Sequence, residues 1–180
     1  MEGKMSDDPR YPIGKFKYQG SPSEEERQQM IAEIEATPAA LRSAVAGLSP
    51  EQLETPYRDG GWNVRQVIHH LPDSHMNAYV RFKLALTEDV PTIKPYMEDG
   101  WAKSSDNLAT PIEISLVLLE SLHQRWIYLL RSLSAEDWKR NFRHPDAERL
   151  VPLEKNLAIY AWHGKHHVAH ITELRKRMGW

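Results

Sequence analysis

The sequence predicts an all-α fold: a four-helix bundle with short extra helices and a long loop between its second and third long helices. Four long segments carry apolar residues at helical spacing, and helix-start patterns precede most of them. No segment alternates apolar and polar residues, so we expect little or no sheet. The 180 residues are enough for one domain with a buried core. We expect an irregular N-terminal arm over residues 1–20 and a single bundle domain over residues 21–180.

The first long helix is predicted to start at residues 21–24, where Ser21 can cap it and Glu24 can complete a capping box. Apolar residues then follow at helical spacing as far as residue 48. Pro38 interrupts this pattern, so we expect the helix to be kinked or divided there. A second start signal at residues 49–52 predicts a short helix.

The second long helix is predicted to begin near Asn63, with a capping glutamine three residues later. Three histidines accompany its apolar stripe. At about 100° per residue, His69 points away from the stripe, His70 lies at its edge and His75 falls near its middle. We expect Pro72 to bend the helix, so the wheel does not fix the register of the residues beyond it. On geometry alone, His70 and His75 therefore both stay open as inward-facing residues.

Residues 88–110 show no period and form the long loop, and long connections are often functional. The third long helix starts at residues 110–113, and its predicted apolar face runs from Ile114 to Leu133. His123 lies beside that face without another histidine nearby, which favours a satisfied core or surface histidine. Residues 134–140 predict another short helical piece.

The fourth long helix is predicted from Leu153 to Met178, and it carries four histidines within eight residues. On a helical wheel, His167 lies about 50° and His163 about 90° from the apolar stripe. His170 lies about 110° away and His166 about 150° away, towards solvent. His163 and His167 are therefore the inward pair. The glycine between them, Gly164, allows another helix to approach closely.

These patterns indicate a metal site, because two imidazoles four residues apart on one helix face can bind the same ion. Seven of the nine histidines lie on two helices that a bundle brings together. The third ligand, His70 or His75, must come from the second long helix. Three neutral imidazoles suit Zn, Ni, Fe or Co, and their number does not rank these metals.

Composition excludes several other classes of protein. The formal net charge is −2, with 23 Lys and Arg against 25 Asp and Glu, so we expect no nucleic-acid partner. The absence of cysteine excludes disulfides and a cysteine nucleophile. We find no secretory signal at the N-terminus and no run of about 18 apolar residues that could span a bilayer. We therefore expect a cytoplasmic protein with no membrane partner.

The chain resembles the DinB/YfiT-like superfamily over nearly its whole length. The segment GGWNVRQVIHHL at residues 60–71 is similar to the first metal motif of that family, and WHGKHH at residues 162–167 is similar to the second. Residues 11–14, 57–61 and 142–146 strengthen the similarity to its YfiT branch.

The resemblance implies a four-helix bundle with one divalent ion per subunit, bound by three histidines. Carried onto this sequence, the ligands are His70, His163 and His167, whereas Pro72 departs from the small residue expected in the first motif. We expect zinc first and nickel as the alternative. The resemblance and the aromatic residues of the arm also suggest a homodimer.

Three functions follow for a small-molecule substrate. The first is hydrolysis by a metal-activated water, although no convincing carboxylate base emerges beside the ligands, and Asp73 could equally have a surface role. The second is transfer of a low-molecular-weight thiol such as bacillithiol, as relatives of this family suggest. The third is a non-catalytic metal-binding module of a stress response. The residues that would take part in catalysis, other than the metal ligands, are unknown from the sequence.

Overall fold

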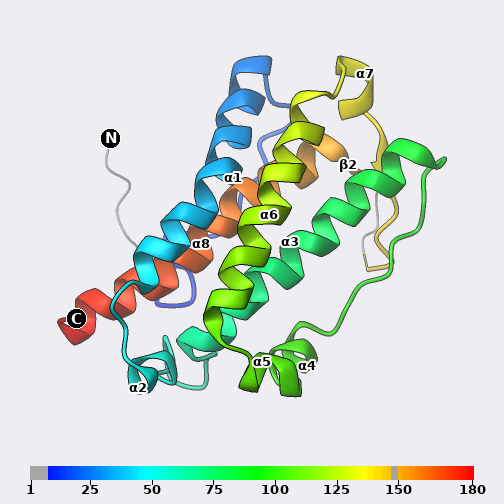
Figure 1. Ribbon diagram of the computed structural model, residues 1–180. Coiled ribbons are helices and arrows are strands. Elements are labelled where there is room, and N and C mark those ends of the chain that lie inside the picture. Colours follow the sequence, from blue (N-terminus) through cyan, green and yellow to red (C-terminus); the bar gives the residue numbers. More distant parts are fainter. Residues whose placement is uncertain (1–7, 147–149) are drawn as a thin grey trace.

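The computed structural model describes residues 8–146 and 150–180 and contains a bundle of four long helices (Figure 1). The long helices are α1 (Glu24–Val45), α3 (Val64–Thr87), α6 (Ile112–Arg131) and α8 (Leu153–Met178). Four short helices join them, α2 (Pro50–Leu53), α4 (Glu98–Ala102), α5 (Ser105–Ala109) and α7 (Ala135–Trp138). Two-residue strands β1 (Asn141–Phe142) and β2 (Val151–Pro152) pair antiparallel. The predicted all-α bundle is confirmed.

Each long helix packs mainly against two others. The principal contacts join α1 to α6 and α8, and α3 to the same two helices. Helices α1 and α3 therefore occupy opposite corners of the bundle, although they follow each other along the chain. This arrangement places α3 directly beside α8, the two helices that carry most of the histidines (Figure 1).

The core consists of two apolar clusters with a polar layer between them. Ile34, Ala78, Trp126 and Ala161 belong to one cluster, whereas Leu41, Leu71, Leu119 and Ile171 belong to the other. In each long helix the change from one cluster to the other spans at most ten residues. Within these intervals lie Thr37 of α1, His75 of α3, His123 of α6, and His163 and His167 of α8. The histidines therefore form a layer across the middle of the bundle.

The helices differ from the predicted patterns at three points. Ser23, rather than Ser21, caps α1, and its partner in the capping box is Glu26. Pro38 does not divide α1, which is one continuous helix. Helix α6 has no side-chain cap, because the residue at its cap position is Pro111.

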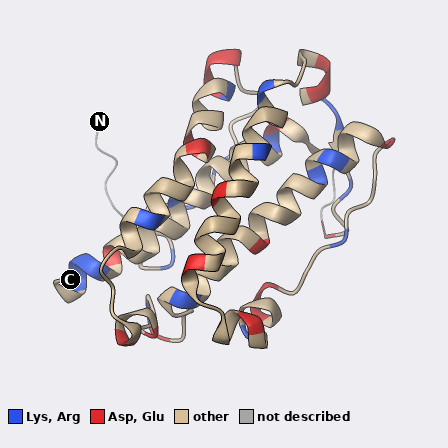
Figure 2. Cartoon of the chain, viewed as in Figure 1, with Lys and Arg blue, Asp and Glu red and all other residues tan. Residues whose placement is uncertain are grey.

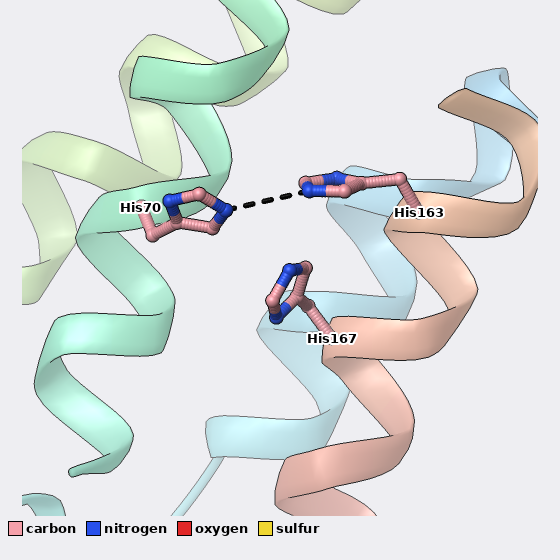
Figure 3. A group of neighbouring side chains, drawn as sticks. All are labelled: His70, His163 and His167. Atoms are coloured by element: carbon pink, nitrogen blue, oxygen red, sulfur yellow. Dashed lines mark hydrogen bonds between the residues drawn. The ribbon is translucent and has the colours of Figure 1, made fainter. Parts of the chain in front are cut away.

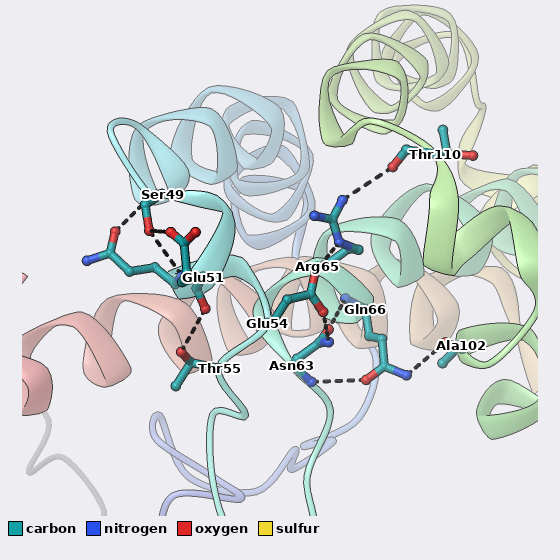
Figure 4. Close-up of polar contacts among 10 residues, drawn as sticks. Ser49, Glu51, Glu54, Thr55, Asn63, Arg65, Gln66, Ala102 and Thr110 are labelled. Atoms are coloured by element: carbon teal, nitrogen blue, oxygen red, sulfur yellow. Dashed lines mark hydrogen bonds and ion pairs between the residues drawn. The ribbon is translucent and has the colours of Figure 1, made fainter.

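The N-terminus of α3 is held by several polar contacts (Figure 4). Asn63 accepts a hydrogen bond from the backbone N–H of Gln66 at 2.8 Å, and Gln66 accepts one from the backbone N–H of Asn63 at 3.0 Å. The amide of Gln66 donates to the carbonyl of Ala102 at 2.8 Å, and that of Asn63 donates to Glu54 at 2.8 Å. These bonds confirm the predicted start of α3 and attach the helix to α4.

The predicted apolar face of α6 is wrong over its first two turns. Ile114, Val117 and Leu118 are 58%, 49% and 42% exposed, whereas Leu116 and Leu119 are buried. The start of α6 is apolar on several sides, so periodicity alone does not identify the side that packs against α1 and α3.

The predicted arm is only partly visible, because residues 1–7 lie outside the described residues. Residues 8–20 form no helix or strand. Acidic and basic residues are both scattered over the face shown in Figure 2, with a basic segment at the C-terminal end of α8. Among the described residues, no helix is long and apolar enough to cross a membrane.

Candidate metal centre

Three histidines of α3 and α8 converge in the middle of the bundle (Figure 3). The Nε2 atoms of His70 and His163 lie 3.3 Å apart. One ring nitrogen from each of His70, His163 and His167 lies within 4.8 Å of the other two. Nitrogens that bind a tetrahedral ion at about 2.0–2.1 Å are about 3.3–3.4 Å apart. The observed spacing of the first pair therefore suits a zinc-sized ion.

The local sequence explains this convergence. His163 and His167 are one helical turn apart on α8, and their ring centroids lie 4.4 Å from each other. Between them, Gly164 packs directly on Thr37 of α1, where a Cβ atom would lie 2.5 Å from the threonine Oγ1. His70 lies about two turns after the start of α3, so the cap at Asn63 fixes its position along the helix axis.

The three rings are in the protonation state that a metal requires. His70 and His167 are only 3% and 9% exposed. Burial lowers the pKa of His70 to about 4, and it lowers the pKa values of His163 and His167 well below the usual value. The neighbouring imidazoles act in the same direction, because two positive charges side by side repel each other. All three are therefore neutral near pH 7 and can donate a nitrogen lone pair.

Trp62 packs against two of the three histidines, His70 and His167. Its ring centroid is 4.7 Å from that of His70 and 6.4 Å from that of His167. The indole Nε1 donates a hydrogen bond to Asp99 at 2.9 Å. A cavity of about 360 Å³ opens beside this tryptophan, and its lining includes Arg58, Asp99 and His167. The cavity is a route by which a small molecule can reach one of the three histidines.

Sequence patterns did not identify Asp99 as a candidate site residue, because residues 88–110 show no helical period. The signal that could have found it is the acidic pair Glu98-Asp99, which lies in the first turn of α4, where acidic residues are favoured. Asp73, by contrast, accepts a hydrogen bond from Asn107 of α5 at 3.2 Å. That contact joins α3 to α5.

His166 does not face solvent as the wheel predicted, and this expectation was wrong. His166 and His170 are 7% and 3% exposed. The arm and the loop before α3 cover them: Tyr57 stacks on His170 at 4.0 Å, and the carbonyl of Arg10 lies 3.3 Å from its Nε2. A helical wheel measures direction relative to the bundle core, so it does not register a segment that packs on the outer face.

The remaining histidines of α3 and α6 are also buried. His69, expected to point away from the apolar stripe, faces Ser115 of α6 with 2.7 Å between Nδ1 and Oγ. His75 is fully buried, and its two ring nitrogens lie 3.1 Å from His163 and 2.8 Å from His123. His123 is therefore a satisfied core residue as predicted, although the statement that no histidine lies near it was wrong. Of the two alternatives on α3, His70 joins the three-histidine group.

Comparisons with known proteins agree with these observations. The profile of the DinB superfamily matches residues 33–171. The YfiT protein of Bacillus subtilis (strain 168), named as a candidate metal-dependent hydrolase, is 52% identical over 170 residues, which cover 94% of this chain and 96% of that protein. A protein of Bacillus cereus (strain AH820) with the same kind of name is 55% identical over 173 residues, covering 96% and 99% of the two chains.

The fold is also that of a solved structure. YfiT from Bacillus subtilis, described as a probable metal-dependent hydrolase with an unusual four-helix bundle topology, superposes with a TM-score of 0.93. The two chains are 51% identical, and the match covers 96% of this chain and 98% of the other. With a family profile over most of its residues and relatives above half identity, this chain belongs to the DinB/YfiT-like superfamily.

Proposed function

We propose that this protein is a metal-dependent hydrolase, with one divalent ion held by His70, His163 and His167. The observation that supports the proposal most directly is the convergence of three neutral imidazoles beside a cavity of about 360 Å³. Zinc is our first choice of metal, because three histidines and an open position are typical of catalytic zinc sites. Nickel is the alternative.

A divalent ion bound by three histidines lowers the pKa of a water ligand towards about 7 and polarises a substrate oxygen. The residues around the cavity supply the other functions. Asp99 is the carboxylate that lines the same cavity as His167, and we propose it as the proton acceptor. The hydrogen bond from Trp62 orients this carboxylate. Arg58 adds a cation to the lining, which would bind an anionic group of the substrate.

The first experiment measures metal content in protein purified without an affinity tag. Replacement of His70, His163 or His167 by Ala is expected to remove tightly bound metal, because two imidazoles bind a divalent ion more weakly than three. His166→Ala is the matched control, since His166 is a buried histidine of the same helix, and it should keep its metal. Circular dichroism confirms that each variant folds. Retention of metal by any of the three ligand variants would exclude that residue as a ligand.

The second experiment separates the candidate reactions. A hydrolase loaded with zinc turns over ester, amide or phosphate substrates without added thiol, and Asp99→Asn is expected to lower kcat by about 100-fold or more while metal content stays unchanged. Thiol transfer would instead appear as conjugation of bacillithiol to monochlorobimane that is lost in His163→Ala. A protein that binds metal but does neither would be a non-catalytic module. The similar proteins named above support hydrolysis and give the thiol reaction no specific support.

A further inference from the structure

Three histidines form a continuous buried row that leads away from the proposed metal site. Nδ1 of His163 lies 3.1 Å from Nε2 of His75, and Nδ1 of His75 lies 2.8 Å from Nε2 of His123. The row ends at the backbone of α1, where Nδ1 of His123 lies 2.7 Å from the carbonyl oxygen of Ile34. It therefore runs through four helices, from α8 to α3 to α6 to α1.

The end of the row determines where each proton lies. A carbonyl oxygen can only accept a hydrogen bond, so His123 carries its proton on Nδ1. A neutral imidazole has one N–H and one lone pair, so Nε2 of His123 accepts a hydrogen bond from Nδ1 of His75. By the same step, Nε2 of His75 accepts one from Nδ1 of His163. His163 then has its lone pair on Nε2, the nitrogen that faces His70.

The surroundings keep the row in this arrangement. His75 and His123 are 0% and 2% exposed, so water does not compete for their nitrogens. Trp126 meets both rings edge-on, with centroids 5.9 Å and 5.8 Å away, and Tyr160 meets His75 in the same way at 5.1 Å. These contacts restrict rotation of the two rings. Burial also lowers the pKa of His123 to about 4, so this histidine stays neutral near pH 7.

We propose that His75 and His123 are positioning residues that hold the proton of His163 on Nδ1 and so direct its Nε2 lone pair to the metal. The inference rests on the proposed ligand role of His163. A fixed tautomer raises metal affinity, because the ligand nitrogen needs no proton shift before it binds. A backbone carbonyl of α1 thereby controls a ligand on α8 through two intervening rings.

The direct test is the tautomer of His163 in the metal-free protein, read from ¹⁵N chemical shifts and long-range ¹⁵N–¹H couplings of the histidine rings. The expected result is a proton on Nδ1 in His163, His75 and His123. A proton on Nε2 of His163 would overturn the inference. This measurement needs neither metal nor activity, so its outcome is separate from the outcome for the proposed hydrolase.

Two substitutions at position 123 provide a second test. His123→Gln can accept from His75 through its oxygen and donate to Ile34 through its nitrogen, so it preserves the direction of the row. His123→Leu fills similar space with neither group. In a competition titration with Zn²⁺, we expect Kd to rise about 10- to 100-fold in the leucine variant and less than about threefold in the glutamine variant. Equal Kd values for the two folded variants would overturn the inference.

The control for a general loss of packing is Leu119→Ala. Leu119 is fully buried one turn before His123 on the same helix, and it belongs to the apolar cluster rather than to the row. This variant should lose stability in a urea titration but keep its zinc affinity. A loss of affinity as large as that of His123→Leu would show that the effect comes from packing, and the proposal would then fail. If the leucine variant does not fold, the tautomer measurement on the unsubstituted protein decides alone.

Discussion

Replacement of Gly164 by Ala tests how closely α1 and α8 must approach to form the site. The added Cβ would lie 2.5 Å from Oγ1, 2.7 Å from Cγ2 and 3.2 Å from Cβ of Thr37. Rotation of Thr37 does not relieve this contact. In each of its three staggered rotamers, the Oγ1 and Cγ2 atoms of Thr37 occupy two of the three positions around its Cβ. Two of these three positions face Gly164, so in every rotamer at least one of the two atoms contacts the added methyl group. The helices must therefore move apart.

The expected change in the free energy of unfolding of Gly164→Ala follows from two opposing effects. Alanine favours a helix over glycine by about 1 kcal/mol, whereas overpacking of a buried contact costs about 1–3 kcal/mol. We expect a net loss of about 1 kcal/mol in the free energy of unfolding, which lowers Tm by about 2–4 °C for a chain of this size. The measurement is a urea titration of the metal-free protein, because bound metal would add stability of its own.

The control for this mechanism is the same substitution in a Thr37→Ala background. The hydroxyl of Thr37 donates to the carbonyl of Glu33 in its own helix, so its removal breaks no hydrogen bond between helices within the described part of the chain. In that background Gly164→Ala should be neutral or stabilising, with a coupling free energy of about 1 kcal/mol or more. Gly100→Ala, where the nearest atom would lie 3.4 Å away, should cost nothing. Equal losses in the two backgrounds would refute the close-contact reasoning.

Two further predictions concern pH and helix capping. The folded pKa values of His70 and His123 are lowered to about 4, below the unfolded value of about 6.5, so the unfolded chain binds more protons between these values. The metal-free protein should keep full stability above pH 6.5 and lose it steadily as pH falls towards 4, and urea midpoints that do not change between pH 7.5 and 5 would contradict this. Asn63→Ala should cost about 1 kcal/mol in the same assay, because the N–H of Gln66 loses its acceptor, whereas Asn63→Ser should retain most of the stability. An equal loss in both variants would mean that the contact with Glu54, not the cap, holds this helix end.

Local sequence signals predict those features of the fold that depend on nearby residues. The capping pair Asn63 and Gln66 marks the start of α3, and the limits of α8 agree with its apolar period and its C-terminal glycine. The apolar stripe of α8 indicates His163 and His167 as the inward pair, and one ring nitrogen of each lies within 4.8 Å of a ring nitrogen of His70. The choice between His70 and His75 needed the relative rotation of α3 and α8, which is set by contacts distant in sequence.

Burial of a helical side chain by a segment outside its own helix could not be predicted in this way. A helical wheel of α8 places His166 on the solvent side. In the structure, however, the ring of Trp162 stacks on His166 with 4.2 Å between ring centroids, and the ring centroid of Tyr11 in the arm lies 6.1 Å away. The arm has no period that would reveal where it packs. Similarly, α4 is five residues long, so the position of Asp99 comes from the contact with Trp62 and not from helix propensity.

The position of the histidine layer between two apolar clusters explains how the site can be both polar and rigid. Buried imidazoles destabilise a fold unless their nitrogens have partners. The row from His163 to Ile34 gives partners to both ring nitrogens of His75 and His123 and to Nδ1 of His163. Outside the row, one buried ring nitrogen has no partner among the described residues in each of four histidines: Nε2 of His69 and Nδ1 of His166, His167 and His170. The apolar clusters on both sides of the layer pack the four long helices against one another. The helices that carry the three histidines of the proposed metal site are therefore positioned by apolar packing on both sides of the layer.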